Sequence, residues 1–302
     1  MALSNDASSV PPLERRLQLL LGKGGVGRST LSAALGLYLS GRGRRVLLCE
    51  MRSQRALPPL FGREASSPGP VALAPGIDWM GLSPGLALST YAGLRLRFRA
   101  VARAVFESPR VRHFLAAVPA LAEILMLGHL CHLAEQGPAE VVILDAPSTG
   151  PALLMLESPR TILQTAPAGP LRDGARWIHE WLSDPRRTAL HRVTLAEELP
   201  VSESLELDER LRRAELPDGL WLLNRLLPED LDAPAEAALA RLAFAPDDPA
   251  RQALAYFRER LSRQRRELAR LRPAEGRSRT FGEQPADRIR ALAPRFAGGA
   301  PP

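Results

Sequence analysis

Residues 22–30 read Gly22-Lys23-Gly24-Gly25-Val26-Gly27-Arg28-Ser29-Thr30, a run of nine residues with four glycines. An apolar run at residues 17–21 precedes it, and apolar side chains at helical spacing follow it through residue 39. A strand, a glycine-rich loop and a helix in this order are the context of a phosphate-binding loop. Glycines let successive backbone N–H groups converge on one anion, and the start of the helix adds its dipole. We therefore predict a phosphate site between a buried strand and a helix.

The side chains of the loop complete the expected site. Ser29 falls where a hydroxyl ligates Mg²⁺, and Thr30 can reach a phosphate oxygen. Arg28 occupies the position of the lysine in the pattern G-x-x-x-x-G-K-[ST]. A glycine-rich turn without a ligand is the alternative, but the strand, the loop, the hydroxyls and the helix all agree with a phosphate site.

Lys23 directly follows the first glycine, and it is the only lysine among the forty Lys and Arg residues of the chain. A compact ammonium group at this position acts as a point charge, which a planar guanidinium cannot replace. The run Lys-Gly-Gly-Val-Gly resembles the deviant Walker A loop of the ArsA, MinD and ParA group of dimeric ATPases. The resemblance implies that Lys23 reaches across a dimer to the partner's nucleotide. The arginine-rich background leaves open whether Arg28 is drift or an inactivating change.

The length of 302 residues has room for one large α/β domain with a helical insert. We expect a disordered lead at residues 1–14, an ATPase domain at 15–272 with a helical insertion at about 84–135, and a C-terminal extension at 273–302. We expect no signal peptide and no apolar stretch long enough to cross a membrane. Cys49 and Cys131 have no paired spacing. A cytoplasmic location is therefore expected.

The net charge of +7 raises the question of a nucleic-acid partner. The arginines are spread along the chain and mixed with Asp and Glu, which is typical of a solvated surface. The densest cluster, at residues 258–272, reads as a helix without aromatic side chains for base stacking. We expect no nucleic acid as a partner.

Three polar residues follow predicted buried strands. Glu50 follows the strand at 45–49, where a phosphate-loop ATPase can hold a carboxylate that orients water. Asp145 follows the strand at 140–144, and an acid at that edge of the sheet can hold Mg²⁺ through water. A lone strand-end aspartate is often only a cap, but its pairing with the loop favours the metal role. Asn224 follows the strand at 220–223, where its amide can pair with an adenine edge.

The rest of the sequence predicts secondary structure in less detail. We predict a surface loop at 62–76, a strand at 77–82, a helical stretch at 84–135, a strand at 189–194, a helix from 201 and a helical remainder at 234–293. Residues 121–133 are almost continuously apolar, which fits either a client groove or buried core. Core is favoured because Met and Leu at helical spacing usually mean packing. The turn at 147–150 is a candidate switch that senses the γ-phosphate.

Four segments in the same order resemble the ArsA-like anion-pump ATPase family, which includes the ATPases that target tail-anchored membrane proteins. They are the Lys-Gly-Gly-Val-Gly loop, Leu-Asp-Ala-Pro-Ser-Thr-Gly at 144–150, Val-Thr-Leu-Ala-Glu-Glu-Leu-Pro at 193–200 and Leu-Leu-Asn-Arg at 222–225. The likeness covers roughly residues 17–272. It implies an α/β P-loop NTPase fold with a mostly parallel, doubly wound sheet, a helical insertion and a helical C-terminal part. It also implies ATP or ADP with Mg²⁺, phosphates cradled by residues 22–30, Ser29 and Asp145 at the metal, and Asn224 at the adenine.

The departures from the family pattern bear on activity. The positions that differ are Arg28 for the loop lysine, Arg52 for the first-switch aspartate, Pro151 for a histidine of the targeting ATPases and Arg225 for the glutamine of an Asn-Gln pair. The chain has no Cys-x-x-Cys, so a zinc-linked dimer is not supported. Its two cysteines are far apart in sequence, which gives arsenite binding little support.

Two functions remain open at the level of sequence. The first is an ATPase that closes as a homodimer or heterodimer on Mg-ATP and hydrolyses it slowly, with Lys23, Arg28, Asp145 and secondarily Glu50 in catalytic roles. The second is a pseudo-ATPase that lends Lys23 to an intact ArsA-like partner. An inert α/β scaffold is a third and blander possibility. The client is unknown, because no motif in the chain identifies it.

Overall fold

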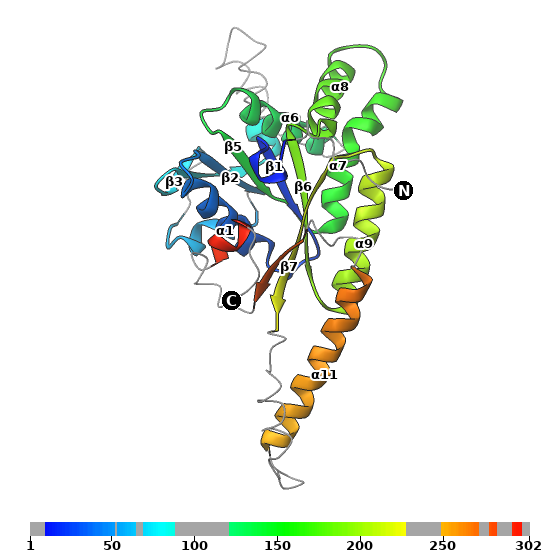
Figure 1. Ribbon diagram of the computed structural model, residues 1–302. Helices are drawn as coiled ribbons and strands as arrows, with labels where there is room; N and C mark the ends of the chain where they lie inside the picture. The colour runs from blue at the N-terminus through cyan, green and yellow to red at the C-terminus, as the bar shows by residue number, and fades with distance from the viewer. Residues whose placement is uncertain are drawn as a thin grey trace.

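The computed structural model describes residues 10–51, 53–64, 69–87, 121–227, 249–271, 278–282 and 292–297. Within these ranges, eight strands form one sheet in the order β3-β4-β2-β5-β1-β6-β7-β8 (Figure 1). Neighbouring strands run parallel, except that β3 is antiparallel to β4. The sheet confirms the expected α/β fold with a mostly parallel sheet.

The strands agree with the predicted runs at the centre of the sheet and depart from them at its edges. The bounds are β1 Leu17–Leu21, β2 Val46–Met51, β3 Val71–Ala74, β4 Ile77–Leu82, β5 Val141–Asp145, β6 Thr188–Leu195, β7 Asp218–Leu226 and β8 Ser278–Gly282. Every residue of β1, β5 and β6 is buried. Continuous burial is typical of parallel strands that helices cover on both faces.

Helices cover the sheet on two sides, as a doubly wound fold requires (Figure 1). The α-helices are α1 Arg28–Ser40, α2 Leu57–Leu60, α6 Leu121–Gln136, α7 Thr149–Thr165, α8 Pro170–Ser183, α9 Glu198–Arg213 and α11 Pro249–Arg270, and the 3₁₀ helices are η1 Pro12–Glu14 and η4 Ala293–Ala297. One apolar cluster lies between the sheet and α6 to α9, and another between the sheet and α1, α2 and η4.

The apolar stretch at 121–133 forms most of α6 and belongs to the core. Leu127, Leu130 and Cys131 have no exposed surface, so core packing is confirmed over a client groove. Most of the expected helical insertion, residues 88–120, lies outside the described residues, as does most of the expected lead at 1–14.

The C-terminal part contains a strand that was not expected. Residues 234–293 were expected to be helical, with an extension at 273–302, and α11 is helical over Pro249–Arg270. Within the expected extension, however, β8 pairs in parallel with β7, and Phe281 of β8 packs against Phe296 of η4 with tilted rings whose centroids are 5.1 Å apart. Phe296 also lies 5.9 Å from the ring of Tyr38 on α1. The strand was missed because Phe281 is the only large apolar side chain in its five residues.

A second edge strand was also missed. Residues 62–76 were expected to form a surface loop, but Val71–Ala74 pairs with β4 as the antiparallel strand β3. Proline, glycine and serine on both sides of this short run hide it in the sequence. Both errors concern the sheet edges, where a strand needs only one hydrogen-bonded neighbour and a short apolar pattern suffices.

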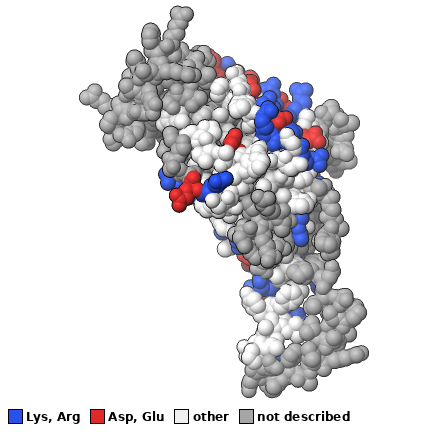
Figure 2. Space-filling model, turned by 90° about the vertical axis from the view of Figure 1, so that its left-hand side faces the viewer, with Lys and Arg blue, Asp and Glu red and all other residues white. Residues whose placement is uncertain are grey.

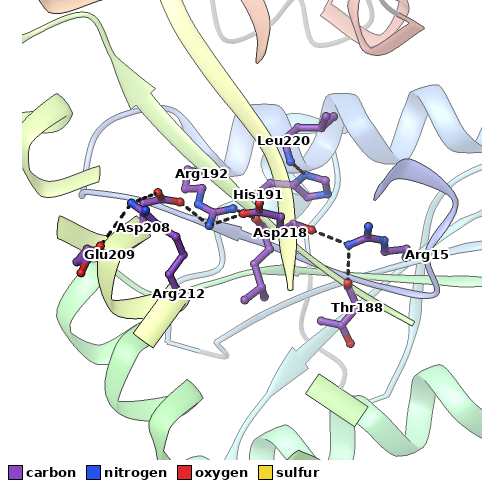
Figure 3. A network of polar contacts seen from close by, with 10 residues as sticks. Arg15, Thr188, His191, Arg192, Asp208, Glu209, Arg212, Asp218 and Leu220 are labelled. Carbon is purple, nitrogen blue, oxygen red and sulfur yellow. Dashed lines mark hydrogen bonds and ion pairs between the residues drawn. The ribbon is translucent and has the colours of Figure 1, made fainter. Parts of the chain in front are cut away.

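A buried arginine joins β6, β7 and α9 (Figure 3). Arg192 of β6 has no exposed surface. Its Nη2 lies 2.6 Å from Asp208 Oδ1 of α9 and 2.9 Å from Asp218 Oδ1 of β7. Arg212, one turn further along α9, reaches the other oxygen of Asp208 at 2.9 Å. Buried charges are tolerated when they are paired in this way.

The neighbouring residues complete the polar network in Figure 3. Arg15 Nη1 donates to the carbonyl oxygens of Thr188 at 2.9 Å and Asp218 at 2.6 Å. His191 Nδ1 accepts the backbone N–H of Leu220 at 3.0 Å, and its Nε2 lies 3.1 Å from Gln18 Oε1. Because Nδ1 accepts, Nε2 must carry the proton and donate to Gln18. The network therefore fixes the position of β6 relative to β7, and both strands contact the glycine loop.

Charges of both signs lie close together on the surface. On the face drawn in Figure 2, Asp and Glu side chains lie beside Lys and Arg. Exposed arginines on α8 and α11 also lie beside acidic residues, because Arg176 pairs with Asp173 and Arg270 with Glu267. Among the helices that the structure describes, none is long and apolar enough to span a membrane.

Candidate nucleotide-binding site

The glycine loop runs from the end of β1 to the start of α1 and packs against β6 and β7. A Cβ at Gly22 would lie 2.3 Å from the carbonyl oxygen of Val193, so only glycine fits there. At Gly27 the φ angle is +92°, and a Cβ would lie 2.2 Å from Asn224 Nδ2. Positive φ and close backbone approach are the two conditions that require glycine. The loop therefore has the conformation that the sequence predicted.

The outer side of the loop is open. The Cβ positions of Gly24 and Gly25 have no atom within 4 Å, and Gly25 has a φ of +86°. Val26 is the opposite case, because its side chain is buried in the core and anchors the loop. An anchored loop with an open outer side is what a phosphate cradle needs.

Ser29 and Asp145 meet beneath the loop. Asp145 ends β5, which pairs directly with β1, and it is only 2% exposed. Ser29 Oγ donates to Asp145 Oδ2 at 2.5 Å. In the described part of the chain, the other carboxylate oxygen, Oδ1, is buried without a hydrogen-bond partner. Burial raises the pKa of Asp145, against the lowering by the Ser29 hydroxyl and the Arg28 charge. Because buried polar atoms are normally satisfied, the orphaned oxygen fits a site for a hydrated cation.

Arg28 joins the first turn of α1 to the segment after β5. Its Nη1 donates to the carbonyl oxygens of Ala146, at 2.7 Å, and of Pro147. Burial lowers the pKa of Arg28, and attraction to Asp145 opposes that shift. The positive charge at the lysine position of the loop is thus bound to the backbone of the candidate switch.

Lys23 pairs within its own chain. Its Nζ lies 2.5 Å from Glu203 Oε1 on α9, and the two side chains are 33% and 37% exposed. Sequence reasoning did not identify Glu203. It is 180 residues from Lys23, and an acidic residue in an amphipathic helix gives no local signal of this role.

Asn224 holds the loop from the side of β7. It is 6% exposed, and its Nδ2 donates to the carbonyl oxygen of Val26 at 2.9 Å. The next residue, Arg225, is exposed and has a φ of +54°. Arg225 and Tyr256 of α11 contribute to the lining of a recess of about 440 Å³. Thr30 lies half-buried in the first turn of α1.

Glu50 departs from its expected role. It has no exposed surface, and its Oε2 accepts the backbone N–H of Ala56 at 2.8 Å. Its Oε1 accepts the indole N–H of Trp79 at 2.9 Å, and both oxygens lie 3.3 Å from the N–H of Leu57. Burial raises the pKa of Glu50, although these hydrogen bonds lower it. With both oxygens committed to the start of α2 and to Trp79, a role in orienting water does not fit. Arg52 lies outside the described residues.

Five of the predicted site residues gather at the carboxyl edge of the parallel strands. They are Lys23, Arg28, Ser29, Asp145 and Asn224. Ligands of doubly wound sheets bind at this edge, and a glycine loop that opens a helix there binds phosphate groups. The fold and the site therefore define a nucleotide-binding protein of the phosphate-loop class.

Comparison with known proteins narrows the class to a family. The model of the ArsA family, described as anion-transporting ATPase, matches residues 15–166, which is half of the chain. The chain belongs to this family. Membership of an ATPase family implies that the site binds nucleotide.

Individual relatives agree with the family. ATPase BagA of Mycobacterium tuberculosis is 29% identical over 228 residues, which are 72% of this chain and 67% of BagA. Protein Rv2184c of the same organism is 32% identical over 168 residues, 51% of this chain and 40% of that protein. A putative arsenical pump-driving ATPase of Aquifex aeolicus is 27% identical over 153 residues, 48% of this chain and 38% of that protein.

Proposed function

We propose that the chain binds Mg-ATP and ADP at the glycine loop and forms a nucleotide-dependent dimer that hydrolyses ATP slowly or only with a partner. The observation that carries the proposal is the buried pair of Ser29 and Asp145, with its orphaned oxygen, beneath an open loop. A hydroxyl and a carboxylate in this arrangement suit Mg²⁺, which favours oxygen ligands and keeps several waters.

Ser29 would hold the metal directly and Asp145 through a water molecule. When bound, Mg²⁺ neutralises charge on the β- and γ-phosphates. The chain's own contribution is the backbone of the loop, which is open around Gly24 and Gly25, and the dipole of α1. Asn224 supports the same loop through Val26 and stays a candidate for contact with the adenine.

Arg28 is the reason to expect slow hydrolysis. Its guanidinium donates through Nη1 to the carbonyl oxygens of Ala146 and Pro147, and these contacts hold its charge at the candidate switch. A guanidinium is also bulkier than an ammonium group and binds as a fork. Losing one well-placed electrostatic contact to a transition state costs about a hundred- to a thousandfold in rate.

Dimer closure requires Lys23 to leave Glu203 if it is to reach the partner's nucleotide. Both side chains are about one-third exposed. Ion pairs exposed to solvent contribute only about 0–1 kcal/mol, so this contact opposes closure weakly. The pair therefore keeps Lys23 ordered without trapping it.

The second candidate is a pseudo-ATPase subunit that pairs with an intact ArsA-like ATPase. Two observations favour it over an active homodimer. Glu50 is occupied by structural hydrogen bonds, and Arg28 is bound to the candidate switch. In this arrangement the chain binds nucleotide and lends Lys23 to the partner's site.

An arsenite site is not part of the proposal. Cys49 and Cys131 are both free and fully buried, and burial raises the pKa of both thiols. Because the thiolate is the form that binds soft metals and metalloids, these cysteines are poor ligands.

Nucleotide binding is tested first by thermal unfolding with and without Mg-ATP. A ligand at a hundred times its dissociation constant adds about 2.7 kcal/mol to the free energy of unfolding. We expect a stabilisation in the natural protein and a smaller one in Ser29→Ala, with Ser40→Ala at the far end of α1 as the matched control. If saturating Mg-ATP shifts neither the natural protein nor the control, the chain is a scaffold and the proposal fails.

ATP turnover then separates the two candidates. Turnover that disappears in Lys23→Ala supports an enzyme. A silent natural protein that binds ATP, together with a gain of turnover in an Arg28→Lys, Arg52→Asp double variant, supports a disabled ATPase. Sedimentation with and without a non-hydrolysable nucleotide measures the expected dimer.

A further inference from the structure

A second recess, of about 310 Å³, lies between α7, α8 and α9. Its inner part is apolar, since Leu156 and Leu216 line it and are 4% and 9% exposed. Its mouth is cationic, because Arg160 of α7 and Arg210 and Arg213 of α9 also line it. We call this feature the distal recess. An apolar interior with a few convergent polar groups is the usual form of a small-ligand site, and the volume lies at the lower end of the range for such sites.

The charges at the mouth of the distal recess do not balance. Glu157 is the one carboxylate among its lining residues, and Arg210 Nη2 occupies both of its oxygens at 2.8 and 2.9 Å. Arg213 Nε donates to Glu209 Oε1 at 3.0 Å. Arg160 pairs with no carboxylate in the described ranges. Its Nη1 donates to the carbonyl oxygen of Arg213 at 3.4 Å, near the upper limit for a hydrogen bond.

The three guanidinium groups therefore keep N–H donors for a ligand. Arg160, Arg210 and Arg213 each use a single nitrogen in the hydrogen bonds found among the described residues. A guanidinium presents its remaining donors in a planar fork that matches carboxylate and phosphate oxygens. An anion at the mouth would thus accept from N–H groups for which the described residues provide no acceptor.

The alternative is that these arginines only stabilise the helices, as surface ion pairs or caps. Arg213 and Glu209 are four residues apart on α9, which is a common exposed helix pair. Arg160 could act only as a cap on the last carbonyl groups of α9. That account explains each residue alone, but it does not explain why arginines of two helices converge on one hollow with an apolar interior.

We propose that the distal recess binds a small organic oxyanion, which has a phosphate or carboxylate group on an apolar body. Arg160 binds the oxyanion, with Arg210 and Arg213 beside it, and the apolar body contacts Leu156 and Leu216. The site is new to this chain, and it does not rest on the proposed nucleotide function.

The distal recess is separate from the glycine loop. α7 begins at Thr149, close after Asp145, and α9 begins at Glu198, near Glu203 and Lys23. Both helices then run back along parallel strands, and the recess lies along their second halves. It therefore sits toward the amino edge of the sheet, whereas the loop sits at the carboxyl edge. A ligand at one site can be distinguished from a ligand at the other by where it protects the backbone.

The test is calorimetric titration with phenyl phosphate and with benzoate, which carry the two candidate head groups on the same apolar ring. Benzyl alcohol and inorganic phosphate supply the body and the head group alone. We expect phenyl phosphate or benzoate to bind, and the better of the two identifies the head group. Arg160→Gln should weaken binding by about tenfold or more, because a charge-assisted hydrogen bond is lost. Arg176→Gln is the matched control, an exposed arginine of α8 that does not line the recess.

Hydrogen–deuterium exchange locates the ligand. Protection at residues 156–164 and 210–216 supports the distal recess. Protection confined to residues 22–30 would place the anion at the glycine loop and overturn the proposal without affecting the nucleotide function. Unchanged binding in Arg160→Gln, with a lower melting temperature, would show that Arg160 is only a helix cap. Failure of both phenyl phosphate and benzoate to bind would also overturn the proposal.

Discussion

Arg28 and Arg192 are two inward-facing arginines that the structure holds in opposite ways. Burial lowers the pKa of both. Arg192 lies within 3 Å of two carboxylates, those of Asp208 and Asp218. Arg28 donates to two neutral backbone carbonyl groups. The charge of Arg192 is therefore balanced by two carboxylates, whereas the charge of Arg28 is only partly balanced.

The difference separates a structural charge from a responsive one. A buried charge with opposite charges around it resists displacement, because removing one partner leaves the other unpaired. A charge bound to carbonyl groups gains energy when an anion arrives, since an ion pair is stronger than a hydrogen bond to a neutral oxygen. Arg192 therefore belongs to the framework of β6 and β7, and Arg28 is the one that an incoming phosphate can move.

The largest effect is expected from removing the structural arginine. Arg192→Ala should lower the free energy of unfolding by about 3 kcal/mol, because Asp208, which is only 14% exposed, loses its buried partner and keeps only the exposed Arg212. Urea unfolding measures the loss. Arg212→Ala is the control, since Arg212 pairs with the same Asp208 but is 62% exposed, and it should cost no more than about 1 kcal/mol. Equal losses in the two variants would contradict the distinction.

A smaller effect, on the rate of ATP hydrolysis, is expected from substituting Arg28. If the chain is an ATPase, Arg28→Lys should raise ATP turnover by about tenfold or more, because a compact ammonium group restores an electrostatic contact to the transition state. Urea unfolding should change little. Arg28→Gln, which removes the charge, should show no gain. A lysine variant that loses turnover would mean that the guanidinium itself is the working group.

The network around Arg192 also predicts a dependence on pH. Burial, with Arg15 and Arg192 nearby, lowers the pKa of His191 to about 3, and the unfolded value is near 6.5. Between these two pKa values, His191 binds a proton in the unfolded chain but not in the folded chain. Stability should therefore fall by about 1.4 kcal/mol for each pH unit below 6.5 on account of this group.

His191→Asn isolates that contribution. Asparagine can accept the Leu220 N–H in place of Nδ1, and it does not titrate, although its shorter side chain does not reach Gln18 as Nε2 does. Urea unfolding of both proteins between pH 7 and 4 should give curves that converge as the pH falls. The buried His129, with a pKa lowered to about 4, is present in both proteins and cancels. Parallel curves would mean that folding leaves the pKa of His191 unchanged.

The smallest effect is expected at the pair of Lys23 and Glu203. Glu203→Gln should change stability by less than about 1 kcal/mol, because the pair is partly exposed. Freed from the carboxylate, Lys23 should favour a nucleotide-dependent dimer, which sedimentation in Mg-ATP measures. Glu206→Gln, on an exposed side of α9, is the control. A dimer fraction that falls in Glu203→Gln alone would mean that Glu203 supports closure.

The sequence predicted correctly those elements whose pattern lies within a few adjacent residues. The glycine loop, the buried strands β1, β2 and β5, and the position of Asp145 at the end of β5 all follow from a few adjacent residues. Asn224 was expected directly after a strand at 220–223, but β7 continues to Leu226 and contains it. β8 and β3 were missed because an edge strand of four or five residues carries too few apolar side chains to be recognised. Glu50 was misread because the acceptor role of a carboxylate depends on which donors surround it, and Trp79 lies 29 residues away.

The phosphate loop, the α/β class and the family can be recognised in the sequence alone, because backbone conformation and apolar periodicity are encoded within short stretches. Which charges are compensated depends instead on contacts between segments that lie far apart in the sequence. Lys23 meets Glu203 across 180 residues, Arg28 meets Ala146 across 118, and the distal recess joins three helices. Electrostatic interactions depend on distance in space, and a linear pattern does not contain that distance.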